Sequence, residues 1–225
     1  MSDINPEFDP QLADFADNPE PRCPCILLLD TSGSMAGNAI TQLNAGLAAF
    51  QESLMQDKLA SLRVEVAIVS FGSQAVMVQD FITADQFVPA TLSAGGSTPM
   101  GAAINMGLDK LEERKQLYRK SGTAYFRPWI FLITDGEPTD EWHGAAQRVQ
   151  DAEDHKAIAF FAVAVEKANM TKLTQIAPRE RPPKPLNGLD FKALFVWLSK
   201  SLTNVSHSKV GDQVPLAPTD GWSSV

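Results

Sequence analysis

The sequence predicts an α/β fold, doubly wound around a mostly parallel central sheet of about six strands, with one antiparallel edge strand and helices on both faces. Three observations support this prediction. Apolar runs of strand length alternate along the chain with longer segments whose apolar residues recur every three or four positions. The runs at 25–29 and 129–133 are continuously apolar, which is typical of strands buried on both faces. The Gly72–Ser73 connection is too short for a parallel crossover, so it predicts an antiparallel pair.

The expected elements follow one another between two irregular ends. Residues 1–22 are acidic and rich in proline and are expected to form an N-terminal arm, packed by Phe8, Leu12 and Phe15. The globular domain is expected over 23–203 and a flexible C-terminal tail over 204–225, in which the large aromatic Trp222 is expected to dock on the domain or on a partner. Strands are expected to end at Asp30 and to lie at 63–71, 75–78, 129–133 and 157–165, with a short edge strand in 179–185; helices are expected around 40–54, 83–88, 99–111, 142–149, 170–176 and 191–202.

Composition limits the classes of function. The 225 residues carry a net charge of −8, which argues against nucleic acid or an anionic membrane as the main partner. The chain has no apolar run of about 18 residues and does not start like a signal peptide, so a cytoplasmic protein is expected. Its two cysteines, Cys23 and Cys25, are interpreted as reduced thiols at the start of a buried strand, because a structural zinc site needs about four ligands.

A candidate site begins where the first strand ends. Asp30 directly follows four aliphatic residues, and Ser32 and Ser34 follow it at alternate positions, with Gly33 between them to allow a tight turn. One carboxylate and two hydroxyls are thereby offered at one place. These are hard oxygen donors, which suit Mg²⁺ or a similar cation and do not suit zinc.

The Asp-x-Ser-x-Ser pattern resembles the metal-ion-dependent adhesion site (MIDAS) of the von Willebrand factor type A (VWA) family. That family also needs a threonine and a second aspartate from two later loops. The segment Gly95–Met100 looks like the second loop, with Thr98 as its hydroxyl, and Thr134–Asp135–Gly136 looks like the third, with Asp135 as the second acid. Thr98 also precedes Pro99, so a second reading makes it only the N-cap of the next helix.

The resemblance implies a function without bond chemistry. Asp30, Ser32, Ser34, Thr98 and Asp135 would hold Mg²⁺ or Mn²⁺, and the open coordination position would accept an Asp or Glu carboxylate of a partner protein. The chain looks similar to the small bacterial TerY-like members linked to tellurium resistance and general stress, whose partners include phosphatase- and kinase-like proteins. The resemblance therefore implies a metal-dependent protein-binding module rather than an enzyme.

Two other classes of function remain as alternatives. A metal-dependent hydrolase or phosphatase could use Asp30 as nucleophile, but the position two residues on, where a second acid would be needed, is Ser32. A serine hydrolase would need a nearby base, and His143 is more simply a surface residue at a helix start. A nucleotide-binding module lacks its signature, because no P-loop or Gly-x-Gly-x-x-Gly follows the first strand.

Overall fold

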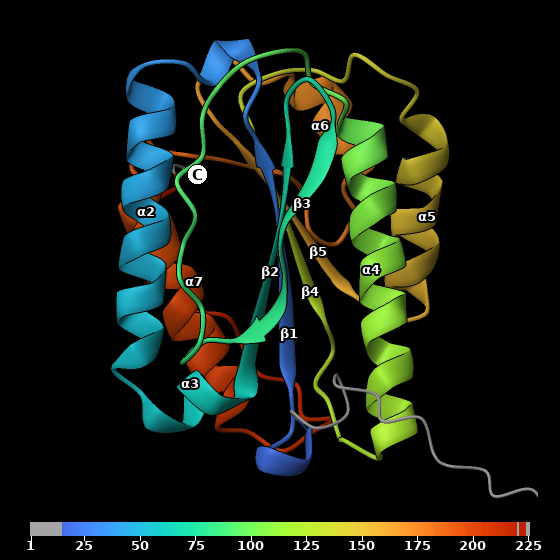
Figure 1. The fold of residues 1–225 in the computed structure, drawn as a ribbon. Coiled ribbons are helices and arrows are strands. Elements are labelled where there is room, and N and C mark those ends of the chain that lie inside the picture. The colour runs from blue at the N-terminus through green and yellow to red at the C-terminus, as the bar shows by residue number, and fades with distance from the viewer. Residues whose placement is uncertain (1–14, 220, 224–225) are drawn as a thin grey trace, which may run out of the picture.

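The computed structural model describes residues 15–219 and 221–223. These residues form a six-stranded sheet in the order β3-β2-β1-β4-β5-β6 (Figure 1). Among the pairings of these six described strands, only β2–β3 is antiparallel, and β3 lies at one edge. The predicted fold class is therefore confirmed. The strands are β1 (Cys23–Asp30), β2 (Val64–Phe71), β3 (Ala75–Thr83), β4 (Trp129–Thr134), β5 (Ala159–Ala164) and β6 (Lys184–Pro185).

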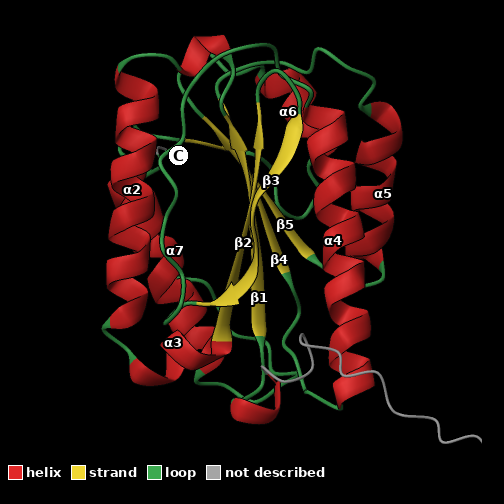
Figure 2. Ribbon diagram, viewed as in Figure 1, coloured by secondary structure: helices red, strands yellow, loops and turns green. Residues whose placement is uncertain are grey.

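Helices cover both faces of the sheet (Figure 2). Helices α2 and α7 pack on one face, and α4 and α5 lie on the other. Successive residues of β1 serve opposite faces, since Leu27 packs in the first core cluster and Leu28 in the second. The helical segments are η1 (Gly33–Met35), α2 (Asn38–Met55), α3 (Lys58–Arg63), α4 (Met100–Ser121), α5 (His143–Asp154), α6 (Met170–Ile176) and α7 (Phe191–Ser206). None of those helices is long and apolar enough to cross a bilayer.

One local prediction was wrong, and one helix was missed. The helix expected at 83–88 does not form, because β3 continues to Thr83 and the chain then turns into an extended loop. Helix α3 was not expected, since six residues are too few to show a periodic pattern. The Asp57 carboxylate accepts a hydrogen bond of 2.8 Å from the Ala60 backbone N–H and so caps this short helix.

The long loop between β3 and α4 is held by Asn44 of α2. The Asn44 side-chain amide donates to the Leu92 carbonyl at 2.9 Å, and its Oδ1 accepts from the Leu92 backbone N–H at 2.8 Å. Leu92 itself is buried. One side chain thus satisfies both backbone polar groups of a buried loop residue, and the loop that follows leads directly to Thr98.

We expect Asn44→Ala to lower the free energy of unfolding by about 1–3 kcal/mol, because the Leu92 N–H and C=O both lose their partner. Urea unfolding of the two proteins, followed by circular dichroism, measures this difference. A substitution of Gln42, whose amide donates a hydrogen bond to Asn38 on the exposed face of the same helix, should change stability little. Equal midpoints for Asn44→Ala and wild type would contradict the role given to this side chain.

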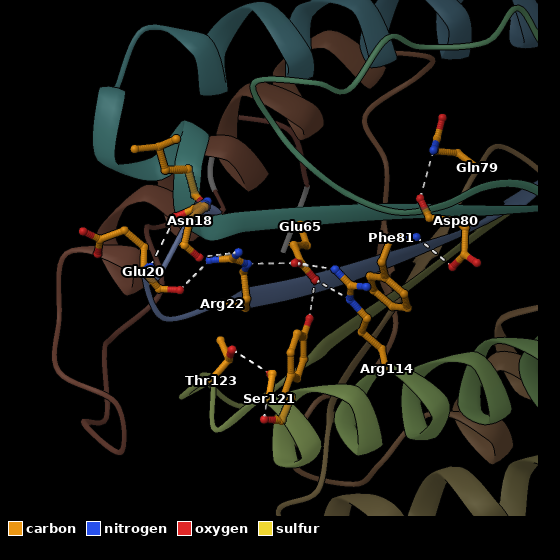
Figure 3. A network of polar contacts seen from close by, with 12 residues as sticks. Asn18, Glu20, Arg22, Glu65, Gln79, Asp80, Phe81, Arg114, Ser121 and Thr123 are labelled. Carbon is orange, nitrogen blue, oxygen red and sulfur yellow. Dashed lines mark hydrogen bonds and ion pairs between the residues drawn. The ribbon is translucent and has the colours of Figure 1, made fainter. Parts of the chain in front are cut away.

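The N-terminal arm is tied to the amino-terminal end of the sheet (Figure 3). The Arg22 guanidinium donates to the Asn18 carbonyl at 2.7 Å and to Glu65 Oε1 at 2.9 Å. The ring of Phe15 is buried, with the Arg114 guanidinium 4.7 Å from its centroid. Phe15 therefore anchors the arm as predicted, whereas Phe8 and Leu12 lie outside the described residues.

The C-terminal segment returns to the domain after α7, which continues past residue 203 to Ser206. Trp222 is 2% exposed, and its ring centroid lies 5.2 Å from that of Trp197 on α7. The Asn187 N–H donates to the Trp222 carbonyl at 2.8 Å. Trp222 therefore docks on the domain itself, which is one of the two outcomes that the sequence suggested.

Candidate metal centre

The predicted acids lie side by side at the carboxyl end of the sheet. Asp30 is the last residue of β1, and Asp135 directly follows β4. These strands are parallel neighbours, with Leu29 paired to Ile133. From β1 the sheet extends in one direction through β2 and in the other through β4, so the two acids flank the topological switch point, where ligands bind in sheets of this kind.

Hydrogen bonds join four of the five predicted residues. The Ser34 hydroxyl donates to Asp135 Oδ1 at 2.8 Å, and the Ser32 and Ser34 hydroxyl oxygens lie 2.9 Å apart. The Ser32 backbone N–H donates to Asp30 Oδ1 at 2.8 Å. The loop after β1 and the loop after β4 thereby share one group of oxygen atoms.

Thr98 belongs to the same group. The surroundings of Gly136 show this. A Cβ atom placed on Gly136 would lie 3.2 Å from Thr98 Oγ1 and 3.6 Å from Asp30 Oδ2. The Thr98 hydroxyl and the Asp30 carboxylate therefore border the same small space. The alternative reading of Thr98 as a helix cap was wrong, because α4 starts at Met100 and its N-cap position is Pro99. All five predicted residues are brought together.

Backbone contacts fix the loop that carries Thr98 against the loop after β1. The Gly95 N–H donates to the Thr31 carbonyl at 2.7 Å, and the Gly33 N–H donates to the Gly96 carbonyl at 3.1 Å. Gly96 has a φ of 83°, and a Cβ there would lie 2.4 Å from the Ser73 backbone nitrogen. Only glycine suits that conformation and that close approach.

Sequence reasoning missed Thr134, which is fully buried beside Asp30. Its hydroxyl donates to Asp30 Oδ2 and accepts the Gly136 N–H at 3.1 Å. Thr134 therefore orients the Asp30 carboxylate and the turn after β4 together. The only signal in the sequence was its place directly before Asp135.

Asp30 is fully buried at the carboxyl end of β1. Burial raises the pKa of this carboxyl group, hydrogen bonds from Ser32 and Thr134 oppose the rise, and the charge of Asp135 adds to it. Two carboxylates at one poorly solvated place repel each other. A cation between them would remove that repulsion, because its charge favours both ionised forms.

The donor set suits a hard divalent cation: it has two carboxylates and three hydroxyls and no sulfur or imidazole. Over 15–219 and 221–223, no group of three or more His, Cys, Asp or Glu residues is arranged to hold a metal ion. Cys23 and Cys25 are free and buried, as expected. Burial, together with the charge of Glu65, raises the pKa of the Cys23 thiol to about 12, which leaves it protonated and unsuited to metal binding.

A sequence model of the von Willebrand factor type A domain matches residues 25–194. The chain therefore belongs to the VWA domain family, as the motifs predicted. A search of curated protein sequences gave no match.

Solved structures share the fold at low sequence identity. The pilus adhesin SpaC of Lactobacillus rhamnosus GG, in its open conformation, superposes with a TM-score of 0.63 and 17% identity over 82% of this chain and 30% of the adhesin. Manganese-loaded TRAP of Plasmodium vivax superposes with a TM-score of 0.54 and 18% identity, over 79% of this chain and 73% of the TRAP chain. Mussel byssus proximal thread matrix protein 1 with a zinc-occupied MIDAS motif superposes with a TM-score of 0.54 and 14% identity, over 82% of this chain and 48% of the mussel chain. The chain thus spans under half the length of the mussel and SpaC proteins.

Proposed function

We propose that this protein is a metal-dependent protein-binding module. Asp30, Ser32, Ser34, Thr98 and Asp135 would hold Mg²⁺ or Mn²⁺. The observation that carries the proposal is the hydrogen bond from Ser34 to Asp135 Oδ1, which joins two parts of the motif that are far apart in the sequence. The zinc in the mussel MIDAS motif and the manganese in TRAP support a divalent cation as the ligand.

The partner is proposed to be a protein that offers an Asp or Glu carboxylate. Few of the ligands in this site are charged, so a bound divalent cation would remain electrophilic and would have room for one more oxygen. The structural relatives include a pilus adhesin, which supports an interaction role without naming the partner. The TerY-like assignment, tellurium resistance, stress response, phosphatase- or kinase-like partners and a cytoplasmic location depend on the sequence resemblance and remain predictions.

The hydrolase alternative is less well supported by the geometry. An Asp30 nucleophile of the phosphatase kind would need a second acid two residues on for general acid or base catalysis, and that position is Ser32. His143 is largely exposed. Its Nδ1 lies 2.9 Å from Glu141 Oε1, and its ring stacks on that of Trp142 with the ring centroids 4.0 Å apart. The arrangement supplies hydroxyl and carboxylate oxygens that are oriented by hydrogen bonds, as a cation site requires.

The metal proposal is tested by titrating the purified chain with Mn²⁺ and counting bound ions by electron paramagnetic resonance. We expect one bound ion, displaced by excess Mg²⁺. Pull-downs from a cell lysate with Mg²⁺ and with EDTA test whether the bound metal captures a partner protein, and at least one protein should be retained only with Mg²⁺. Absence of Mn²⁺ binding would contradict the proposal, and turnover of a phosphoester would favour the hydrolase.

We expect Ser32→Ala to weaken Mn²⁺ binding by only about tenfold, because a water molecule can take the place of one neutral ligand. The same titration measures the change. Ser53→Ala is a matched control, since this serine contacts Ser199 between α2 and α7 and lies in the helical layer. A loss of Mn²⁺ affinity as large as that caused by removing Asp30 would show that Ser32 does more than donate one neutral oxygen.

A further inference from the structure

The first turn of α4 is capped by a residue from another loop. The N-cap residue Pro99 makes no side-chain hydrogen bond to the helix. Instead the Asp140 carboxylate accepts the Gly101 N–H on Oδ1 at 3.0 Å and the Ala102 N–H on Oδ2 at 2.8 Å. Both carboxylate oxygens are therefore used by free N–H groups of the helix, which every α-helix leaves at its start.

The residue before Asp140 holds Thr98 in the same way. The Thr139 backbone N–H donates to the Thr98 carbonyl at 3.0 Å, and the Thr139 hydroxyl accepts the Thr98 backbone N–H at 3.1 Å. Both backbone polar groups of Thr98 are thus bound to one residue. Rotation of the Thr98 backbone would break two hydrogen bonds at once.

Close backbone packing completes the connection. A Cβ atom on Gly101 would lie 2.1 Å from the Glu141 carbonyl oxygen and 2.9 Å from Trp142 Cα, so the start of α4 is in direct contact with the loop after β4. At the other end of that loop, Gly136 approaches the Thr98 hydroxyl. The segment 136–142 therefore touches the Thr98 region at both of its ends.

We infer that Asp140, together with Thr139, is a positioning residue that sets the place of the Thr98 hydroxyl relative to Asp135 in the metal centre. The inference rests on the proposed function. Asp135, Thr139 and Asp140 lie on one loop, and Thr98 lies on another. Two of the hydrogen bonds described above join these loops directly, and the two from Asp140 hold the start of α4, which follows Thr98. The distance between the Thr98 and Asp135 ligands therefore depends on all four.

A double-mutant cycle separates positioning from ordinary helix capping. Isothermal titration calorimetry with Mn²⁺ is applied to wild type, Asp140→Ala, Thr98→Ala and the double variant, each as the full chain. We expect Asp140→Ala to weaken Mn²⁺ binding about tenfold. In the Thr98→Ala background the same change should have an effect of less than about twofold, because the ligand that Asp140 positions is already absent.

Two further variants control for stability. Asp57→Ala removes the capping carboxylate of α3 at the opposite end of the molecule (Figure 1) and should leave Mn²⁺ affinity unchanged. Asp140→Asn keeps one acceptor oxygen for α4 and serves if the alanine variant does not fold; it should weaken Mn²⁺ binding by less than Asp140→Ala does.

Unchanged Mn²⁺ affinity in Asp140→Ala, or an equal loss in both backgrounds, would overturn the inference. If wild type itself binds no Mn²⁺, the proposed function fails instead. Crystal structures of metal-free wild type and Asp140→Ala then decide the positioning role. It is supported if Thr98 moves away from Gly136 in the variant, and it is overturned if the approach is unchanged.

Discussion

Asp30→Asn should weaken Mn²⁺ binding by more than about 100-fold, the largest effect expected of any single change in the metal centre. Asparagine has nearly the same shape, and its carbonyl oxygen can still accept the Ser32 N–H, which Asp30 Oδ1 now accepts at 2.8 Å. It lacks the charge that attracts a cation, and its NH₂ group would face Thr134 Oγ1. Any protein captured only with Mg²⁺ should be lost with the ion. Calorimetric titration and pull-down measure both effects.

Asp30→Ala tests the same charge less cleanly. It leaves the Ser32 N–H and the Thr134 hydroxyl without their acceptor in a buried place, which costs about 1–3 kcal/mol of stability. Asp109→Asn is the matched control, because this exposed carboxylate on α4 pairs only with Arg148 among the described residues. Mn²⁺ affinity equal to wild type in Asp30→Asn would leave the Asp-x-Ser-x-Ser segment as an ordinary loop.

The sequence predicted that these five residues lie together because each of the three segments that carry them has a recognisable local pattern. Asp30, Ser32 and Ser34 lie within five residues, and Asp135 ends an apolar run that is recognisable as a strand. The carboxyl ends of adjacent parallel strands necessarily share one edge of the sheet, so two such acids meet there. The roles of Thr134 and Asp140 were not predicted, because neither residue belongs to a recognised pattern and their partners, Asp30 and the start of α4, are distant in the chain.

Helices were predicted where the spacing of apolar residues repeats over several turns. The apolar stripe of α2 repeats over several turns and was recognised, whereas the six residues of α3 were not. The segment 83–88 failed for another reason. Phe87 is 1% exposed and packs against the ring of Phe50 on α2, so its apolar character indicates burial and not a helix.

The burial of Glu65 and its ion pairs could not be predicted from the sequence. An acid inside an apolar strand could face solvent at the edge of the sheet, and only the structure shows that this side chain is 1% exposed. Its partners come from the arm and from α4, far along the chain in both directions. Long-range charge pairing of this kind cannot be deduced from periodicity, because each member alone resembles a surface residue.

Glu65→Ala should lower the free energy of unfolding by about 3–5 kcal/mol. Its carboxylate binds Arg22 at 2.9 Å and Arg114 at 2.7 and 2.9 Å, and it accepts the Tyr118 hydroxyl (Figure 3). Removing it leaves two guanidinium groups together in a poorly solvated place without the anion between them. Urea unfolding at neutral pH measures the loss, and amide exchange at Asn18, Glu20 and Arg22 should accelerate because the arm loses its attachment.

Two controls give this prediction its meaning. Glu112→Ala on α4 removes ion pairs to Lys115 and Arg119, but the Glu112 side chain is 47% exposed, so the expected loss of stability is at most about 1 kcal/mol. Mn²⁺ affinity of folded Glu65→Ala should equal that of wild type, since the cluster lies at the amino-terminal end of β2 and the metal centre at the opposite end of the sheet. A stability loss no larger than that of Glu112→Ala would show that water replaces Glu65, and a weaker Mn²⁺ affinity would show that the two ends of the sheet are coupled.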